Sequence, residues 1–111
     1  MDDLVRWLRA QLDEDERVAR GAIDNSPWRA AVRSGLDVVE GDGWTVCNAS
    51  EADTAHIAEW DPARVLREID AKRRIIATLH EEGGDRMFAD IFSLLALPYA
   101  DRPGYREHWR P

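Results

Sequence analysis

The sequence predicts an α+β fold that is mostly α, with three to four helices packed with one antiparallel β-hairpin. Two long segments carry apolar residues at three- and four-residue steps, the spacing of one helix face. Between them lie two short β-branched runs separated by Gly41-Asp42-Gly43, a pattern typical of a hairpin turn. The 111 residues are 44% apolar and include five Trp, enough for one compact domain with a core. We therefore expect a single domain over residues 1–111.

The first expected element is an N-terminal helix over residues 1–23. Pro27 prevents its continuation, because Pro lacks a backbone donor and restricts the residue before it. Trp28 then follows as an expected core anchor. The apolar residues of this helix recur at helical spacing and begin with Leu4, Trp7, Leu8 and Leu12.

The expected hairpin covers residues 35–48. An isolated hairpin is only marginally stable in water, so one face of it must pack on the helices. The side chains expected on that face are Leu36, Val38, Trp44 and Val46.

A short helix and then a long helix are expected over residues 52–82. Ser50 or Asp53 can cap the short one. The long one begins at Asp61-Pro62, where the Asp61 carboxylate can accept a hydrogen bond from an unpaired N–H of the first turn. Pro62 suits the first helical position, where its missing N–H costs nothing. An apolar stripe with one interruption follows, comprising Pro62, Val65, Leu66, Ile69, Lys72, Ile76 and Leu79.

A last helix is expected over residues 85–97, with Asp85 as its cap. Its side chains are apolar on most sides, so we expect it to be the most buried helix. Pro98 stops it. Residues 98–111 are too rich in Pro and Gly for another long helix, and their aromatic residues predict a tail that packs back on the domain. These aromatic residues are Tyr99, Tyr105 and Trp109.

The net charge of −7 comes entirely from the middle of the chain. Seven of the 22 acidic residues lie between positions 37 and 61, a segment without Lys or Arg, and the other 15 equal the 15 basic residues in number. An acidic surface there would repel nucleic acid and attract a partner with a basic surface. An ordinary solubilising face is the simpler alternative. The seven residues are Asp37, Glu40, Asp42, Glu51, Asp53, Glu59 and Asp61.

The expected location is the cytoplasm, without a membrane partner. No run approaches the roughly 20 apolar residues of a membrane span, and Met1-Asp2-Asp3 lacks the basic-then-apolar order of a signal peptide. Cys47 is the one cysteine of the sequence, which excludes an intrachain disulfide and a cysteine-based zinc site.

Several blocks of the sequence resemble an uncharacterised family, a domain of unknown function, of small actinobacterial and actinophage proteins. The similarity covers most of the chain and implies no particular activity. More loosely, the order of the hairpin and the two following helices is similar to short accessory reading frames of temperate phages. The blocks that carry the family resemblance are residues 4–18, 56–66, 71–75, 95–101 and 109–111.

The chain departs from that family at two places. Relatives often carry a second His where this chain has Trp60, and many have a Cys-containing insertion where this chain has only residues 81–85. The second His and the Cys could support a metal role in relatives. The resemblance therefore does not imply such a role for this chain.

No catalytic residues and no cofactor are predicted. No two His have the helical spacing of a zinc protease, and neither a nucleophile elbow nor a phosphate-binding glycine loop is present. One alternative is a small metal- or ligand-binding protein, because His56 and Asp53 are three residues apart on one short helix and Asp61 follows. In the long helix, five acids balance five bases between residues 61 and 82, which argues against a nucleic-acid helix.

The function expected from these observations is that of a non-enzymatic protein-interaction or regulatory accessory module. A homodimer is one form considered, and an acidic inhibitor that imitates nucleic acid is another alternative. Trp60 and Trp109, each next to charged residues, are the expected exposed aromatics. Asp61 and Pro62 are expected to act as a structural cap. The candidate contact residues are Asp37, Glu40, Asp42, Glu51, Asp53, Glu59, Trp60 and Trp109.

Overall fold

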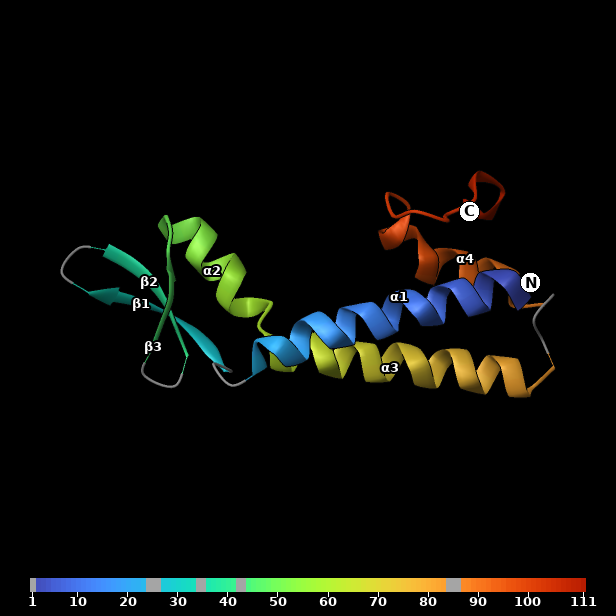
Figure 1. Ribbon diagram of the computed structural model, residues 1–111, viewed down its shortest axis with the longest axis horizontal. Coiled ribbons are helices and arrows are strands. Elements are labelled where there is room, and N and C mark those ends of the chain that lie inside the picture. The colour runs from blue at the N-terminus through green and yellow to red at the C-terminus, as the bar shows by residue number, and fades with distance from the viewer. Residues whose placement is uncertain (1, 24–26, 34–35, 42–43, 84–86) are drawn as a thin grey trace. The chain divides into compact units, whose positions relative to one another are not determined.

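The computed structural model describes residues 2–23, 27–33, 36–41, 44–83 and 87–111 (Figure 1). The α+β, mostly α class is confirmed. None of the helices in the described residues combines the length and the apolar character of a membrane span. The elements are α1 (Asp2–Gly21), β1 (Trp28–Arg33), β2 (Leu36–Gly41), β3 (Trp44–Asn48), α2 (Glu51–Glu59), α3 (Pro62–Glu81) and α4 (Ala89–Ala96), with short 3₁₀ turns at Leu97–Tyr99 and Glu107–Trp109.

The chain forms two compact units. The first, here called the terminal unit, consists of Met1–Asp15 and Ile69–Pro111, and the second, the central unit, consists of Glu16–Glu68. Their boundaries fall inside α1 and α3, so each of these helices contributes to both units. The single domain expected from the sequence stays a prediction.

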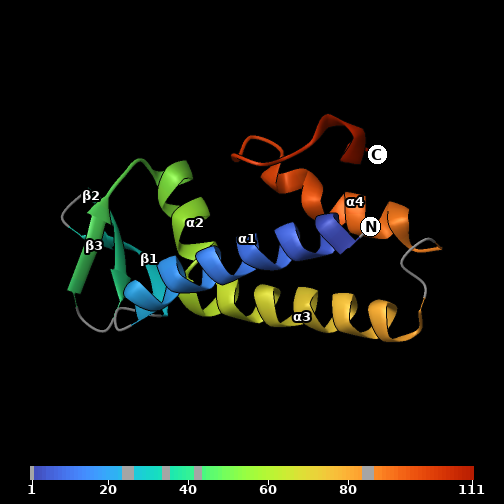
Figure 2. The same ribbon diagram turned by 45° about the vertical axis from the view of Figure 1, so that its right-hand side comes forward.

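The core of the terminal unit is built from one side of α1, α3 and α4. Leu4, Leu8 and Leu12 follow one another at one-turn spacing on α1 and are fully buried. Ile76 of α3 and Phe92 of α4 are also fully buried. The beginning of α1 runs beside the end of α3 (Figures 1 and 2). These helices therefore bury the apolar stripes that define them in the sequence.

The C-terminal tail packs back on the first turns of α1. The ring of Trp7 lies 5.6 Å from that of Tyr105 and 5.5 Å from that of Trp109, measured between centroids. The indole N–H of Trp7 donates a hydrogen bond of 3.2 Å to the carbonyl of Pro103. The expected return of the tail is confirmed, and we call this contact the aromatic clasp.

A polar contact extends the clasp along α1. The Tyr99 hydroxyl donates to Asp15 over 2.8 Å, and the Arg102 guanidinium lies 2.6 Å from the other carboxylate oxygen. Near the end of the chain, Arg106 pairs with Asp3 at 3.3 Å. Charged hydrogen bonds of this kind fix the register of the tail on the helix.

Gly104 is required by the geometry of the clasp. Its φ of +89° lies in the left-handed region that glycine tolerates. A Cβ at this position would stand 2.7 Å from the Trp7 indole nitrogen. The tail therefore approaches Trp7 more closely than any residue with a side chain would permit.

The expectation that the last helix is the most buried is confirmed among the described helices, because three of the eight residues of α4 are buried, a larger share than in α1, α2 or α3. Its side chains Phe92, Ser93 and Ala96 are buried. However, Leu94 is 56% exposed and Met87, just before the helix, is 80% exposed. These apolar residues reach solvent because α4 packs with only one side. The expected cap, Asp85, lies outside the described residues.

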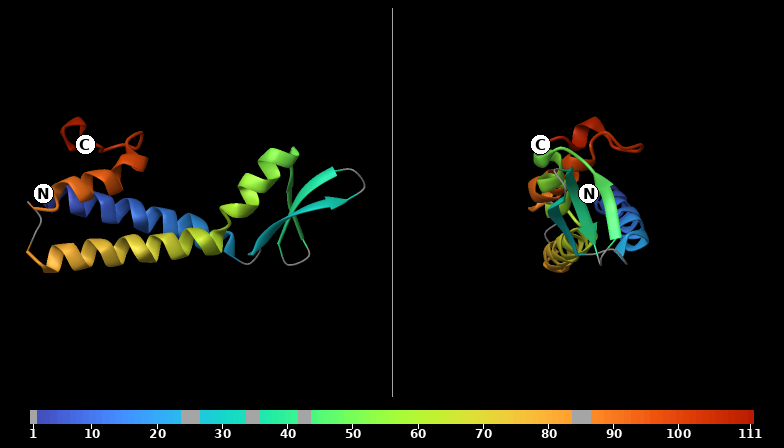
Figure 3. Two further views of the ribbon diagram at one scale, coloured as in Figure 1. Left: turned by 180° about the vertical axis from the view of Figure 1, so that it is seen from behind. Right: turned by 90° about the vertical axis from the view of Figure 1, so that its left-hand side faces the viewer.

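The central unit contains a three-stranded antiparallel sheet in the order β1-β2-β3. The expected hairpin corresponds to β2 and β3, whereas β1 was not predicted. A bulge interrupts the hairpin, because Val39 pairs with Cys47 and Glu40 pairs with Thr45, which leaves Val46 as the extra residue. Helix α2 packs against β1 and β2 (Figure 3).

Candidate functional site

The site is built around the junction of α2 and α3, in the central unit. Asp61, between the helices, is only 6% exposed. Its Oδ1 accepts a hydrogen bond of 2.9 Å from the backbone N–H of Arg64, and its Oδ2 accepts one of 3.1 Å from the backbone N–H of Trp28. One carboxylate thus caps α3 and ties the cap to β1. Pro62 occupies the first position of the helix, where it is buried.

Trp60 is the large aromatic residue that this junction presents to solvent. Its side chain is 44% exposed. Its backbone N–H donates to the carbonyl of His56 over 3.2 Å and so closes the last turn of α2. The Arg64 guanidinium lies 4.1 Å from the ring centroid of Trp60, and the His56 ring lies 6.2 Å away. This arrangement is a cation–π contact on one face of an exposed indole.

Two carboxylates hold Arg64 in place against the indole. A guanidinium nitrogen lies 2.7 Å from a carboxylate oxygen of Glu59, and another lies 3.3 Å from Glu68. The indole ring, the guanidinium and the two carboxylates therefore restrain one another's positions. Isolated surface side chains are less restrained. We call this group the Trp60 surface, comprising His56, Glu59, Trp60, Arg64 and Glu68.

The acidic candidates on α2 lie beside this surface in the chain. Glu51 and Asp53 are both exposed and lie in the first turn of α2, where negative charge is favourable next to the helix N-terminus. The Ser50 hydroxyl caps this helix by accepting a hydrogen bond of 3.3 Å from the Asp53 N–H. Three further acidic candidates lie outside the part of the chain that the structure describes. They are the residue Asp42 and the side chains of Asp37 and Glu40.

The residues of the metal-binding alternative do not form a ligand set. The Asp61 carboxylate accepts hydrogen bonds from two backbone N–H groups. His56 is exposed beside Trp60. Across the part of the chain that the structure describes, no group of three or more His, Cys, Asp or Glu is placed to hold a metal ion. The alternative centred on His56, Asp53 and Asp61 therefore gains no support from this geometry.

Trp109 is not an exposed aromatic, so that expectation is wrong. It is 6% exposed because it packs in the aromatic clasp with Trp7 and Tyr105. A charged side chain lies over its ring, because the Arg106 guanidinium stands 5.3 Å from the ring centroid.

Two members of the Trp60 surface were missed from the sequence, Arg64 and Glu68. The available signal was their spacing, because Trp60, Arg64 and Glu68 follow at four-residue steps across the start of α3. Such steps place side chains on one face of a helix and its cap.

The comparisons with known proteins identify one family. The family described as "Family of unknown function (DUF6221)" matches residues 1–111. No curated protein matches the chain, and no solved structure does. The resemblance to a domain of unknown function is thus confirmed over the full length of the sequence.

Proposed function

Because this chain belongs to DUF6221, a family of unknown function, we propose its role from its geometry: a non-enzymatic protein-binding module that acts through the Trp60 surface. The observation that carries this proposal is an indole 44% exposed to solvent and yet held on one face by Arg64 at 4.1 Å. Trp and Arg are the residues most enriched among those that dominate binding energy at protein interfaces.

The restraint on Arg64 supports the proposal. Ordering a long side chain on binding costs about 0.5–1.5 kcal/mol of free energy. Glu59 and Glu68 already order Arg64, with contacts of 2.7 and 3.3 Å. The surface therefore loses less entropy on association than an ordinary patch with an unrestrained Arg would.

The charge around the surface favours a basic partner. Glu51, Asp53 and Glu59 are exposed on α2, and the base-free segment they belong to carries the net charge of −7. A field of one sign increases the association rate of an oppositely charged partner and disfavours nucleic acid. We propose a protein with a basic face as the partner.

The resemblance of residues 56–66 and 95–101 to small actinobacterial and actinophage proteins leads us to propose an accessory, regulatory role of that type. We place it in the cytoplasm, where an unpaired cysteine such as Cys47 is usual because thiols are kept reduced. A homodimer remains one form in which such a module would act.

The test is capture of partners by the purified protein from a lysate of the organism that encodes it, followed by affinity measurement with the captured partner. Trp60→Ala should weaken association by about 2 kcal/mol, or roughly thirtyfold in Kd, because it removes a central aromatic contact. Ile75→Ala is the matched control, since Ile75 is 43% exposed and lies in the terminal unit. Equal affinities of the two variants would refute the role of the Trp60 surface.

The same experiment separates the alternatives. If the partner is a nucleic-acid-binding protein and Glu51→Lys with Asp53→Lys abolishes association while Trp60→Ala leaves it intact, the chain is an acidic imitation of nucleic acid. If elemental analysis of untagged protein finds stoichiometric metal that is lost in His56→Ala, the metal-binding alternative replaces our proposal.

A further inference from the structure

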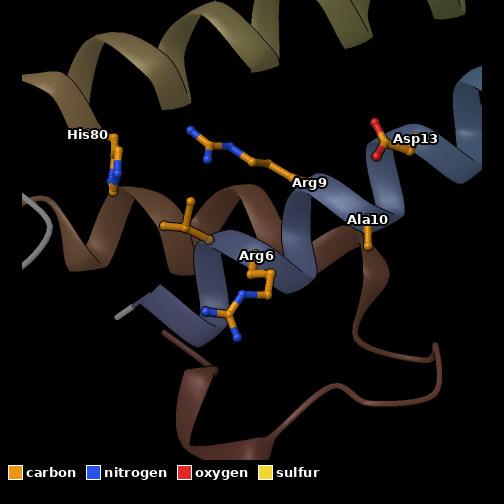
Figure 4. Close-up of a pocket in the computed structure, with 6 residues that line it drawn as sticks. Arg6, Arg9, Ala10, Asp13 and His80 are labelled. Carbon is orange, nitrogen blue, oxygen red and sulfur yellow. The ribbon is translucent and has the colours of Figure 1, made fainter.

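A hollow of about 520 Å³ lies between α1 and α3, within the terminal unit. Volumes of roughly 300–1,000 Å³ are typical of sites for small molecules. The buried side chain of Val5 contributes apolar surface to it, as does Ala10. Its polar lining consists of Arg6, Arg9, Asp13 and His80 (Figure 4).

Arg9 is the arginine of the hollow that pairs with no other described residue. Among the residues that the structure describes, it has no ion pair or hydrogen bond. Asp13 does not neutralise it, because the Asp13 carboxylate pairs with Arg73 at 2.6 Å. Arg6 makes only a long, exposed contact of 3.6 Å with Asp3. The hollow thus carries excess positive charge in a chain whose net charge is −7.

The Arg9 guanidinium and the His80 imidazole point toward the same space (Figure 4). In Figure 4 the Arg9 side chain extends from α1 toward α3, and the His80 ring points from α3 toward α1, whereas Arg6 points away from α3. A guanidinium offers N–H groups in a fork that matches two oxygens of a carboxylate or phosphate. An imidazole N–H can donate to a further oxygen.

We propose that this hollow binds a small organic anion whose carboxylate or phosphate monoester group is held by Arg9 and His80. The apolar surface of Val5 and Ala10 then contacts the organic part of the ligand. This inference does not depend on the proposed function, since all its residues lie in the terminal unit and the Trp60 surface lies in the central unit.

The test uses phenyl phosphate and benzoate as probes and phenol as the uncharged control, each titrated to millimolar concentration into the full-length protein. NMR of the Arg9 Nε–Hε and the His80 ring should show saturable shifts with the two anions and none with phenol. The anion with the lower Kd identifies the head group that the site prefers.

Arg9→Gln tests the site directly, and Arg67→Gln is its matched control. Like Arg9, Arg67 is an exposed helical arginine without a partner in the described part of the chain, but it does not line the hollow. Arg9→Gln should raise the Kd about tenfold or more, the usual effect of a lost charge-assisted hydrogen bond. Arg67→Gln should leave it unchanged. Equal effects of the two changes, or shifts that do not involve Arg9 and His80, would overturn the proposal.

Discussion

Replacing Asp61 by Ala removes the acceptor that joins α3 to β1. The hydrogen bonds lost include one of 2.9 Å from the Arg64 N–H and one of 3.1 Å from the Trp28 N–H. Losing a helix cap costs about 0.5–2 kcal/mol of unfolding free energy. Leaving a second, partly buried N–H without a partner costs about 1–3 kcal/mol more. We therefore expect Asp61→Ala to destabilise the protein by about 2–4 kcal/mol.

The assay is urea unfolding at neutral pH, combined with hydrogen exchange at the Arg64 and Trp28 amides. Both amides should lose protection in Asp61→Ala. In Asp61→Ser the shorter hydroxyl can still cap α3, so the Arg64 amide should retain protection while the Trp28 amide loses it.

Asp70→Ala provides the matched control on the same helix. The Asp70 carboxylate contacts Arg74 at 3.0 Å, but both side chains are largely exposed, at 61% and 78%. Exposed pairs of this kind contribute at most about 0.5 kcal/mol. Should Asp61→Ala cost no more than Asp70→Ala, the two-bond role of Asp61 would be refuted.

Two further predictions concern the C-terminal tail. Gly104→Ala should destabilise the aromatic clasp by about 2–3 kcal/mol, since it combines a φ of +89° with a contact of 2.7 Å to Trp7; unfolding monitored by tryptophan fluorescence measures this. Gly83→Ala has a φ of +69° but no neighbour within 4 Å, so equal losses in the two variants would show that the close approach is irrelevant. The hydrogen bond and charge of Arg110 lower the pKa of Glu107. The ion pair of Glu107 with Arg110 should therefore persist at pH values in and above the ordinary range of glutamate pKa values. It should break as the pH falls through the lowered pKa of Glu107. In Arg110→Gln the pKa of Glu107, followed by carboxyl ¹³C shifts, should rise to its ordinary range; an unchanged value would contradict this cause.

Local chemistry made much of the fold predictable. The start of α3 is specified by two adjacent residues, an acceptor at Asp61 and a ring at Pro62 that needs no partner. The hairpin follows from β-branched runs around paired glycines. In each case the interacting residues are close in sequence, so the sequence pattern alone is sufficient to predict the element.

Strand β1 could not be predicted in the same way. Its sequence, Trp28-Arg29-Ala30-Ala31-Val32-Arg33, has few residues with strand preference. It is a strand because it pairs with β2 over its whole length, from Trp28 with Gly41 to Arg33 with Leu36. Pairing with a neighbouring strand outweighs the weak preference of the segment itself.

Predicting the candidate site was limited by the same distinction between local and distant contacts. Trp60 and Trp109 are both flanked by charged residues, so the sequence does not indicate which of the two side chains is exposed. The structure does, because Trp109 meets Trp7 from the far end of the chain, whereas the cation beside Trp60 is only four residues away, at Arg64. The exposure of each Trp side chain therefore depends on whether a residue far away in sequence packs against it.

The sheet order has a consequence for self-association. With β2 in the centre, β1 and β3 are edge strands, and exposed edges offer unpaired backbone groups to the strands of other molecules. The bulge at Val46 makes the β3 edge irregular, which discourages such addition. On β1, the Asp61 carboxylate occupies the first backbone donor, that of Trp28. The residue that caps α3 thus also protects one end of an edge from intermolecular strand pairing.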